Sequence, residues 1–315
     1  MRVLVTGGAG FIGSHLVDGL LYSGLEVGIL DDFSSGAESN LTNHLKDVRI
    51  HRGSITNEEF VSKVVQCYDV VLHQAARISV TRSVKNPIFT NTINVDGTLN
   101  LLVAARKAGV ERFVYASSSS VYGDTPALPK VESMPPHPLS PYAVSKLAAE
   151  AYCGVFASIH GLKTVSLRYF NVYGPRQSPG PYSGVIPTFI DTIKNGKAPL
   201  IYGDGLQTRD FTYVRDVVQA NLLAMTKPVR GGEVFNVGSS KRITINDLAE
   251  TILRLLKRPD LKPIHLQERA GDVKHSLADI TRISHDLGYS PKYHLDEGIA
   301  ETLGNKKTEA KVGPT

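Results

Sequence analysis

Three glycines near the amino terminus constrain the fold of this chain more than any other sequence feature. An apolar run, residues 2–6, is followed by Gly7 and Gly10 and then by a stretch with helically spaced apolar residues, 11–23, whose third residue is Gly13. Glycine allows a tight turn and a close approach of the backbone to a ligand, and the start of a helix presents free N–H groups and positive dipole charge. The segment predicts a buried strand, a phosphate-binding turn and a helix; a tight turn without a ligand is the alternative.

Apolar strands and helical patterns alternate through the first half of the chain. The predicted strands cover 2–6, 26–30, 47–51, 70–73, 112–116 and 164–167, with helices near 57–66, 90–108 and 142–160 between several of them. Parallel neighbours need long crossover connections, so this alternation predicts an α/β fold with a doubly wound parallel sheet and helices on both faces.

Prolines and glycines interrupt the alternation after about residue 167. A smaller α+β unit is predicted to begin there, and a helix at 216–225 followed by a strand at 233–237 predicts a return to the sheet. The two units are therefore expected to interleave in sequence. The first covers 1–167 plus 211–237, the second 168–210 plus 238–302, and the polar tail 303–315 is expected to be disordered.

Composition excludes several classes of protein. The 315 residues are 42% hydrophobic and 21% charged, as in an average globular chain with a proper core. The net charge of +5 is spread along the sequence without a basic run of five, so nucleic acid is not an expected partner. Cys67 and Cys153 are far apart, which argues against a zinc site or a disulfide framework. No apolar run of 18 residues occurs, so we expect a cytoplasmic protein without a membrane partner.

An aspartate after the second predicted strand indicates the type of dinucleotide. Asp31 lies 18 residues beyond Gly13, where a carboxylate can accept hydrogen bonds from the adenine ribose and repel a 2′-phosphate. No Arg or Lys occurs between residues 31 and 45 to neutralise such a phosphate. The sequence thus favours NAD over NADP; the alternative is that Asp31 and Asp32 are solvated loop residues.

A tyrosine and a lysine stand four residues apart at the start of the predicted helix that Ser140-Pro141 introduces. Tyr142 and Lys146 share one helix face, so the lysine cation can stabilise a tyrosine phenolate. The spacing alone carries little information, and its value is geometric. A tyrosine base working near neutrality needs its pKa lowered from ~10 by ~3 units.

Four serines, Ser117 to Ser120, end the strand that begins at Arg112. In an open parallel sheet ligands bind beyond the carboxyl ends of the strands. A serine hydroxyl there can hydrogen-bond the group that Tyr142 deprotonates. The alternative is that the serines only finish the strand.

Several motifs in one order give the chain a resemblance to the extended short-chain dehydrogenase/reductase superfamily, and most closely to its NAD-dependent UDP-sugar 4-epimerases. They span roughly residues 1–300 and comprise the glycine turn, Asn94–Thr98, the serine strand, Ser140–Lys146, Arg168–Pro175, Gly203–Phe211 and Arg269–Asp272. The resemblance implies a Rossmann domain that binds NAD, a smaller domain that binds a UDP-sugar, and a homodimer. It also implies reversible C4 epimerisation of UDP-glucose and UDP-galactose through a 4-keto sugar.

The resemblance also implies roles for individual residues. Tyr142 would be the base, Lys146 its electrostatic partner, and Ser118 and Ser120 the catalytic hydroxyl residues. The cofactor would be held by Tyr142 and Lys146 and by Gly7, Gly10, Phe11, Ile12, Gly13, Asp31, Asp32, Ser34, Ser35, Gly36, Ser54, Ile55, Ala75, Ala76, Asn94 and Tyr169. The substrate would be held by Ser118, Asn171, Val185, Tyr202, Arg209, Arg269, Asp272 and Ser276, and no metal is expected.

Two positions distinguish this chain from its relatives. Ser54 stands where members of the family that the chain resembles usually carry an aspartate near the adenine. Serine can still hydrogen-bond but carries no charge, so the adenine contact is expected to be weaker or to be made by the backbone. Ser276 falls where a bulky tyrosine would border the sugar's C2 substituent, so UDP-N-acetylhexosamines are expected to fit as well. The alternative is that Tyr173 or His275 fills this space.

The residues after the serine strand distinguish between alternative activities. Nucleotide-sugar dehydratases and decarboxylases need an acid there, whereas this chain has Ser119-Ser120. A noncatalytic dinucleotide-sensing or RNA-binding protein is the alternative from another class, because fold does not determine function. The presence of Tyr142, Lys146 and Ser118 argues against it.

Overall fold

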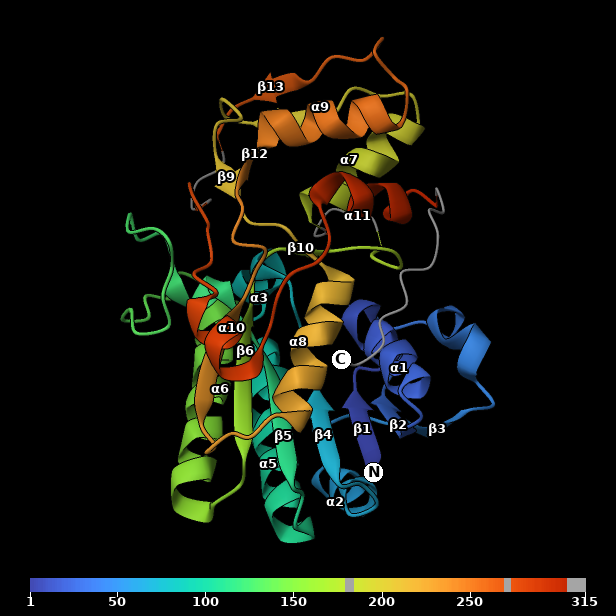
Figure 1. The fold of residues 1–315 in the computed structure, drawn as a ribbon, viewed down its shortest axis with the longest axis vertical. Helices are drawn as coiled ribbons and strands as arrows, with labels where there is room; N and C mark the ends of the chain where they lie inside the picture. Colours follow the sequence, from blue (N-terminus) through green and yellow to red (C-terminus); the bar gives the residue numbers. More distant parts are fainter. Residues whose placement is uncertain (179–183, 269–272, 305–315) are drawn as a thin grey trace.

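A computed structural model describes residues 1–178, 184–268 and 273–304, and its centre is a seven-stranded parallel sheet (Figure 1). The strand order is β11-β6-β5-β4-β1-β2-β3, so the chain winds outward from β1 in both directions. The strands are β1 (Arg2–Thr6), β2 (Glu26–Asp31), β3 (Val48–Arg52), β4 (Val70–His73), β5 (Arg112–Ser118), β6 (Thr164–Tyr169) and β11 (Glu233–Val237). The predicted doubly wound sheet is confirmed, including the return of 233–237 to its edge.

Helices cover both faces of the sheet because successive strand residues point to opposite sides. Val3 and Val5 of β1 contribute to one core with α1 (Phe11–Tyr22) and α8 (Val214–Thr226). Leu4 points the other way, into a second core. That core contains residues of α2 (Glu58–Val65), α5 (Gly97–Ala108) and α6 (Pro141–His160).

Local signals explain where α6 begins and ends. The Ser140 hydroxyl accepts a hydrogen bond from the Ala143 N–H at 3.1 Å, and Pro141 occupies the first turn, where its missing N–H costs nothing. Gly161 ends the helix in the left-handed conformation. The 20-residue helix therefore carries Tyr142 and Lys146 in its first two turns.

The helix predicted near 90–108 is divided into three pieces. A short helix α4 (Pro87–Asn91) is followed by a π-helical turn η2 (Thr92–Asp96) and then by α5. Asn94 lies in the wide turn, and its side chain bonds the backbone of Arg77 at both ends of the amide. Such π turns are rare interruptions of α-helices and are frequent at functional sites.

A smaller group of elements lies beyond the carboxyl ends of the strands (Figure 1). It contains α7 (Val185–Lys194), α9 (Ile245–Leu255) and α11 (Leu295–Thr302), which share a separate apolar core. Short ladders complete it: β7 (Val172–Tyr173) with β10 (Thr212–Tyr213), β8 (Leu200–Tyr202) with β13 (Ile264–Leu266), and β9 (Thr208–Arg209) with β12 (Ile243–Thr244).

One helix of the carboxyl-terminal region lies beside the sheet and not in the smaller group. Ile283 and Leu287 of α10 (Thr281–Leu287) belong to the same core as α1 and α8. The division of the chain into two domains with the boundaries given above stays a prediction. The predicted disordered tail lies outside the described residues from 305 onward.

Candidate functional site

The glycine turn between β1 and α1 is packed against the end of β4. Gly7 has a φ of +67°, and a Cβ there would lie 2.8 Å from the Ala75 backbone nitrogen. A Cβ on Gly13 would lie 2.1 Å from the Gly7 carbonyl oxygen. Both positions require glycine, and the turn presents the N-terminal end of α1 to a ligand, as a dinucleotide pyrophosphate needs.

Asp31 ends β2 and is buried beside this turn. Its carboxylate accepts hydrogen bonds from the N–H groups of Ala9 at 2.9 Å and Phe33 at 2.8 Å. Burial raises the pKa of Asp31, whereas these two bonds lower it. An ionised carboxylate has about four acceptor positions, so two remain for the hydroxyls of a ribose. Asp32 is exposed and accepts the Ser34 N–H at 2.9 Å.

The loop after β2 combines open and tightly packed residues. Ser34 and Ser35 are exposed, whereas a Cβ on Gly36 would lie 2.8 Å from the backbone of Ala9. An arginine does reach this loop, although none is near in sequence. Arg52 of β3 lies 4.0 Å from the centroid of the Phe33 ring and pairs with Glu38. Because Glu38 neutralises its charge, Arg52 does not offer an unpaired cation to a 2′-phosphate.

The remaining predicted cofactor residues fall into three groups. Ala75 and Ala76 follow β4, and Ser54 and Ile55 follow β3, at the carboxyl edge of the sheet; Ser54 bonds the Thr56 hydroxyl at 2.9 Å. Phe11 and Ile12 begin α1 and pack against the core of α7 and α9. Asn94 and Tyr169 are buried in protein contacts: the Asn94 amide also donates to Ser145, and the Tyr169 hydroxyl bonds Asn221.

The catalytic candidates come together from β5 and α6. Ser118 ends β5, and its hydroxyl accepts the Ser120 N–H at 3.2 Å, which begins the short helix η3 (Ser119–Tyr122). Burial raises the pKa of Tyr142, and a hydrogen bond with Ser118 lowers it. Among the described residues the buried Ser120 hydroxyl has no hydrogen-bond partner. An unpaired buried hydroxyl is unfavourable, so this position fits a polar ligand group.

Lys146 lies one turn beyond Tyr142 and is buried. Its Nζ donates to the Ala116 carbonyl at 2.8 Å and lies 5.0 Å from the centroid of the Tyr115 ring. These contacts do not offset the loss of water, and burial lowers the pKa of Lys146 to about 7. Without a ligand the site disfavours both the lysine cation and the tyrosine phenolate.

A buried ion pair holds the serine strand against α6. Glu150 accepts the Ser117 hydroxyl at 2.6 Å and pairs with Arg168 of β6 at 2.6 Å. The Arg168 guanidinium also lies 4.7 Å from the centroid of the Tyr122 ring. Sequence reasoning missed this network, because its members lie on four different elements, most of them distant from one another in sequence.

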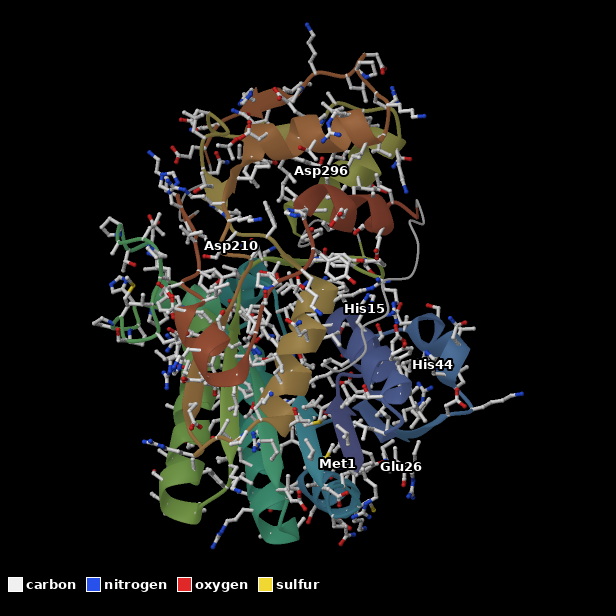
Figure 2. The ribbon with its side chains drawn as sticks, viewed as in Figure 1. Met1, His15, Glu26, His44, Asp210 and Asp296 are labelled. Carbon is white, nitrogen blue, oxygen red and sulfur yellow. The ribbon has the colours of Figure 1, made fainter. Side chains whose placement is uncertain are left out.

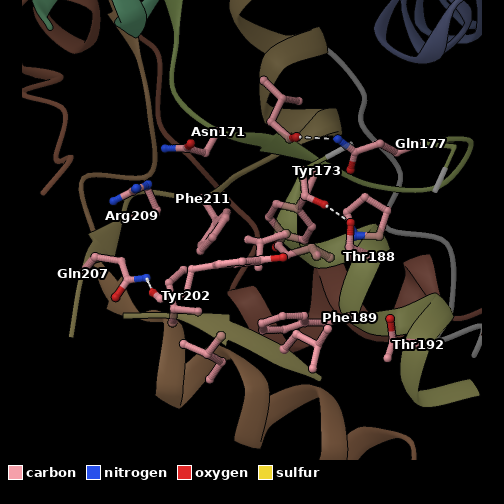
Figure 3. A pocket seen from close by; sticks show the side chains of 18 residues that line it. Asn171, Tyr173, Gln177, Thr188, Phe189, Thr192, Tyr202, Gln207, Arg209 and Phe211 are labelled. Atoms are coloured by element: carbon pink, nitrogen blue, oxygen red, sulfur yellow. Dashed lines mark hydrogen bonds between the residues drawn. The ribbon is translucent and has the colours of Figure 1, made fainter. Parts of the chain in front are cut away.

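A cavity of 540 Å³ lies among the smaller group of elements (Figure 3). Four predicted substrate residues line it: Asn171, Val185, Tyr202 and Arg209. Figure 3 shows Asn171 and Arg209 together at one end, beside Phe211. The walls also include Phe189 and Gln177, whose buried Oε1 has no hydrogen-bond partner in the described structure. Aromatic walls with a few polar groups suit a nucleotide.

Asp210, which the sequence analysis did not select, holds the residues around this end. Its buried carboxylate accepts the N–H groups of Ser239, Ser240 and Ala278 at 2.8 to 3.1 Å. Its carbonyl accepts the Asn171 amide at 3.0 Å. Burial raises the pKa of the Asp210 carboxyl group (Figure 2), whereas the hydrogen bonds from the Ser239 hydroxyl and from the three N–H groups lower it. In the sequence, only its position next to Arg209, a predicted substrate residue, could have indicated Asp210.

Ser276 lies in an extended segment beside β9. Its N–H donates to the Thr208 carbonyl at 3.0 Å, and it is not among the described residues that line the 540 Å³ cavity. His275 next to it bonds the Thr208 hydroxyl at 2.9 Å, and the Tyr173 hydroxyl donates to the Leu295 carbonyl. Arg269 and Asp272 lie outside the described residues.

The described residues contain neither a cluster of metal ligands nor a membrane-spanning helix. No group of three or more His, Cys, Asp or Glu side chains there could hold a metal ion. Within the same ranges no helix has the length and apolar character that crossing a membrane requires.

Comparison with known proteins identifies the family. Residues 3–238 match the model of the NAD dependent epimerase/dehydratase family. The chain belongs to this family, whose members use NAD. A UDP-glucose 4-epimerase from Mycolicibacterium smegmatis is 42% identical over 307 residues, which are 96% of this chain and 97% of the relative.

Solved structures give the same result. The UDP-glucose 4-epimerase of Thermotoga maritima with UDP-glucose has a TM-score of 0.92 at 40% identity, covering 97% of this chain and 98% of that one. A UDP-N-acetylglucosamine 4-epimerase from Methanobrevibacter ruminantium has a TM-score of 0.92 at 41% identity, covering 96% and 97%. Family members named as a decarboxylase and as dehydratases are also 34 to 36% identical over 96% of this chain. The family is therefore clear, and the specific reaction is a separate question.

We predict that Lys146 destabilises the NAD-free protein at and below neutral pH. Its pKa is about 7 in the folded protein against 10.5 ordinarily, so the unfolded chain binds more protons between these values and the free energy of unfolding rises with pH there. Between pH 6 and pH 9 the free energy of unfolding of the wild type should rise by about 2 to 3 kcal/mol relative to that of Lys146→Met. Denaturant titrations of both proteins measure this. A stability difference that is the same at both pH values would contradict it.

Proposed function

We propose that this chain catalyses the reversible C4 epimerisation of UDP-hexoses, namely UDP-glucose and UDP-galactose, through a 4-keto sugar. The observation that carries the proposal is the grouping of Ser118, Tyr142 and Lys146 at the carboxyl edge of the sheet, with Ser119 and Ser120 where an acid would serve dehydration. Epimerisation needs one proton transfer and no further acid. Bound NAD would supply a reversible acceptor for the hydride at C4.

In this proposal each side chain has a defined task. Tyr142 as phenolate takes the proton of the sugar 4-hydroxyl and later returns it to the same oxygen. Lys146 stabilises the phenolate by its charge, and the Ser118 hydroxyl orients the 4-hydroxyl through a hydrogen bond. The glycine turn would hold the cofactor pyrophosphate, and the carboxylate of Asp31 would hold the ribose.

The 540 Å³ cavity would hold the nucleotide end of the substrate. Arg209 and Asn171 lie together at one end of the cavity. The arginine would supply a cation, and the asparagine an amide donor, to a diphosphate. The aromatic rings of Phe211 and Phe189 would cover the base. Arg269 and Asp272 complete the proposed substrate set by resemblance.

Nuclear magnetic resonance of UDP-glucose incubated with the protein tests the proposal. We expect UDP-galactose to form, and Tyr142→Phe to lose ~10²-fold or more in rate while still binding the nucleotide sugar, since general-base catalysis supplies about that factor. Release of water or carbon dioxide from a suitable sugar nucleotide would instead favour a dehydratase or decarboxylase. Near-normal turnover by Tyr142→Phe would refute the proposed base.

Ser276 is proposed to leave room for an N-acetyl group at the sugar C2 position. The side chain is small and 9% exposed, so a tyrosine here would fill adjoining space. Ser276→Tyr should suppress turnover of UDP-N-acetylglucosamine much more than turnover of UDP-glucose. Rates on both substrates, measured before and after substitution, decide the question. Equal losses, or no turnover of the N-acetylated substrate by the wild type, would show that Ser276 is not the gate.

A homodimer through α6 is also proposed. The resemblance predicts an interface formed by the helices near 90–108 and 142–160, with the apolar residues Leu99, Leu102, Val103, Leu147, Ala151 and Val155. Of these, Leu102 is fully buried in the protein's own core. Val144, Tyr152, Val155 and Ile159 are instead exposed and recur at helical spacing along α6. Such an apolar stripe suits a second copy of the chain.

Light scattering at micromolar concentration tests the dimer. The expected mass is twice 34.2 kDa. Val155→Glu should give monomers because it places a charge in the stripe, whereas Ile264→Glu, which alters an equally exposed residue on β13, should not. A wild-type mass near that of one chain would contradict the proposal.

A further inference from the structure

Arg176 lies between the substrate cavity and the cofactor turn. It follows β7 and directly precedes Gln177, which lines the cavity. Its φ of +65° is a left-handed conformation that a residue other than glycine adopts at a cost in free energy. Strained residues of this kind persist where surrounding contacts over-determine them.

The contacts of the Arg176 guanidinium reach two elements of the NAD-binding region. Nη1 donates to the Asn40 carbonyl at 3.0 Å. Nη2 pairs with the Asp18 carboxylate and donates to Nδ1 of His15 at 2.9 Å, both on α1. The side chain therefore joins the start of the substrate wall to α1 and to η1 (Glu38–His44).

The protonation of His15 follows from these contacts. A guanidinium can only donate, so Nδ1 of His15 must accept, and the ring is neutral with its proton on Nε2. That proton is donated to the Pro175 carbonyl at 2.9 Å. Burial and the neighbouring Arg176 charge lower the pKa of His15 to about 4, in agreement with a neutral ring. The backbone before Arg176 and its side chain are thus both fixed to α1.

The segment that contains Asn40, which Arg176 contacts through Nη1, packs on the glycine turn. The Ala37 N–H donates to the Ala9 carbonyl at 3.0 Å, and the Asn40 side chain donates to the same carbonyl at 2.8 Å. Gly36 packs on Ala9 as well. An unbroken chain of contacts therefore runs from the cavity wall through Arg176 to the turn where the dinucleotide would bind.

We propose that Arg176 is a positioning residue that holds segment 36–44 against the glycine turn and so slows the release of NAD. The inference goes beyond the proposed function, because it concerns cofactor retention and not the sugar. It also links the two halves of the site: a ligand that binds the wall at Gln177 would tighten the binding of NAD at equilibrium, and NAD would tighten the binding of that ligand by the same factor.

The rate of NAD dissociation from the full-length protein tests this proposal. Protein loaded with radiolabelled NAD is chased with an excess of unlabelled NAD, in the absence of any sugar nucleotide. We expect Arg176→Met to release NAD about tenfold faster or more, the factor that loss of a charge-assisted contact supplies. Amide hydrogen exchange within residues 37–44 of the NAD-free protein should also become faster.

Arg258→Met is the matched control. Arg258 likewise pairs with an aspartate, Asp260 at 2.7 Å, and donates to a backbone carbonyl, that of Ile193, but it contacts neither α1 nor η1. It should leave NAD release unchanged. Unchanged NAD release in a folded Arg176→Met protein would overturn the proposal.

A second variant keeps the test decisive if Arg176→Met does not fold. Asp18→Asn removes the partner carboxylate from α1, which also lies 3.2 Å from Nε2 of His44 in η1, and should also speed NAD release. Because the two residues share one contact, the double variant should release NAD more slowly than the product of the two single effects would give. An unchanged rate in Asp18→Asn would refute the role of the pair. Because NAD alone is followed, the result is independent of whether the epimerase proposal holds.

Discussion

Helices on both faces of the parallel sheet leave its carboxyl edge as the place where polar groups can gather. All seven strands of the sheet end at this edge, and the glycine turn, Asp31 and Ser118 lie directly at strand ends. Their positions are therefore set by apolar packing far from the site, in the two cores that flank the sheet. Substitutions in those cores would move the site residues together.

The same packing buries Tyr142 and Lys146 and shifts the pKa of both side chains. The NAD-free site disfavours the charged form of both side chains, because burial raises the pKa of the tyrosine and lowers that of the lysine. A phenolate base therefore needs further positive charge nearby. In our account the oxidised nicotinamide supplies it, so the base becomes active only when the cofactor is present. This would limit proton abstraction to the loaded protein.

Local signals were sufficient to predict the sheet, the glycine turn, the start of α6 and the serine strand. The Ser140 cap, the apolar periodicity and the glycine spacing each act within a few residues. Features that depend on contacts distant in sequence were missed. Three contacts of this kind join segments that no local pattern relates: Arg52 with Phe33, Asp210 with Ala278, and Arg176 with Asp18 of α1. The π turn at Asn94 was also missed, and Asn94 there bonds the Arg77 backbone 17 residues earlier in the chain.

Spectrophotometric titration of tyrosine ionisation tests the central claim most directly. The NAD-free and NAD-bound proteins are titrated from pH 6 to pH 10, and the same titrations of Tyr142→Phe are subtracted. The account predicts one tyrosinate that forms well below pH 10 in the NAD-bound protein, is missing in Tyr142→Phe, and does not form over this range in the NAD-free protein. Identical titrations with and without NAD would contradict it, as would a tyrosinate that survives in Tyr142→Phe.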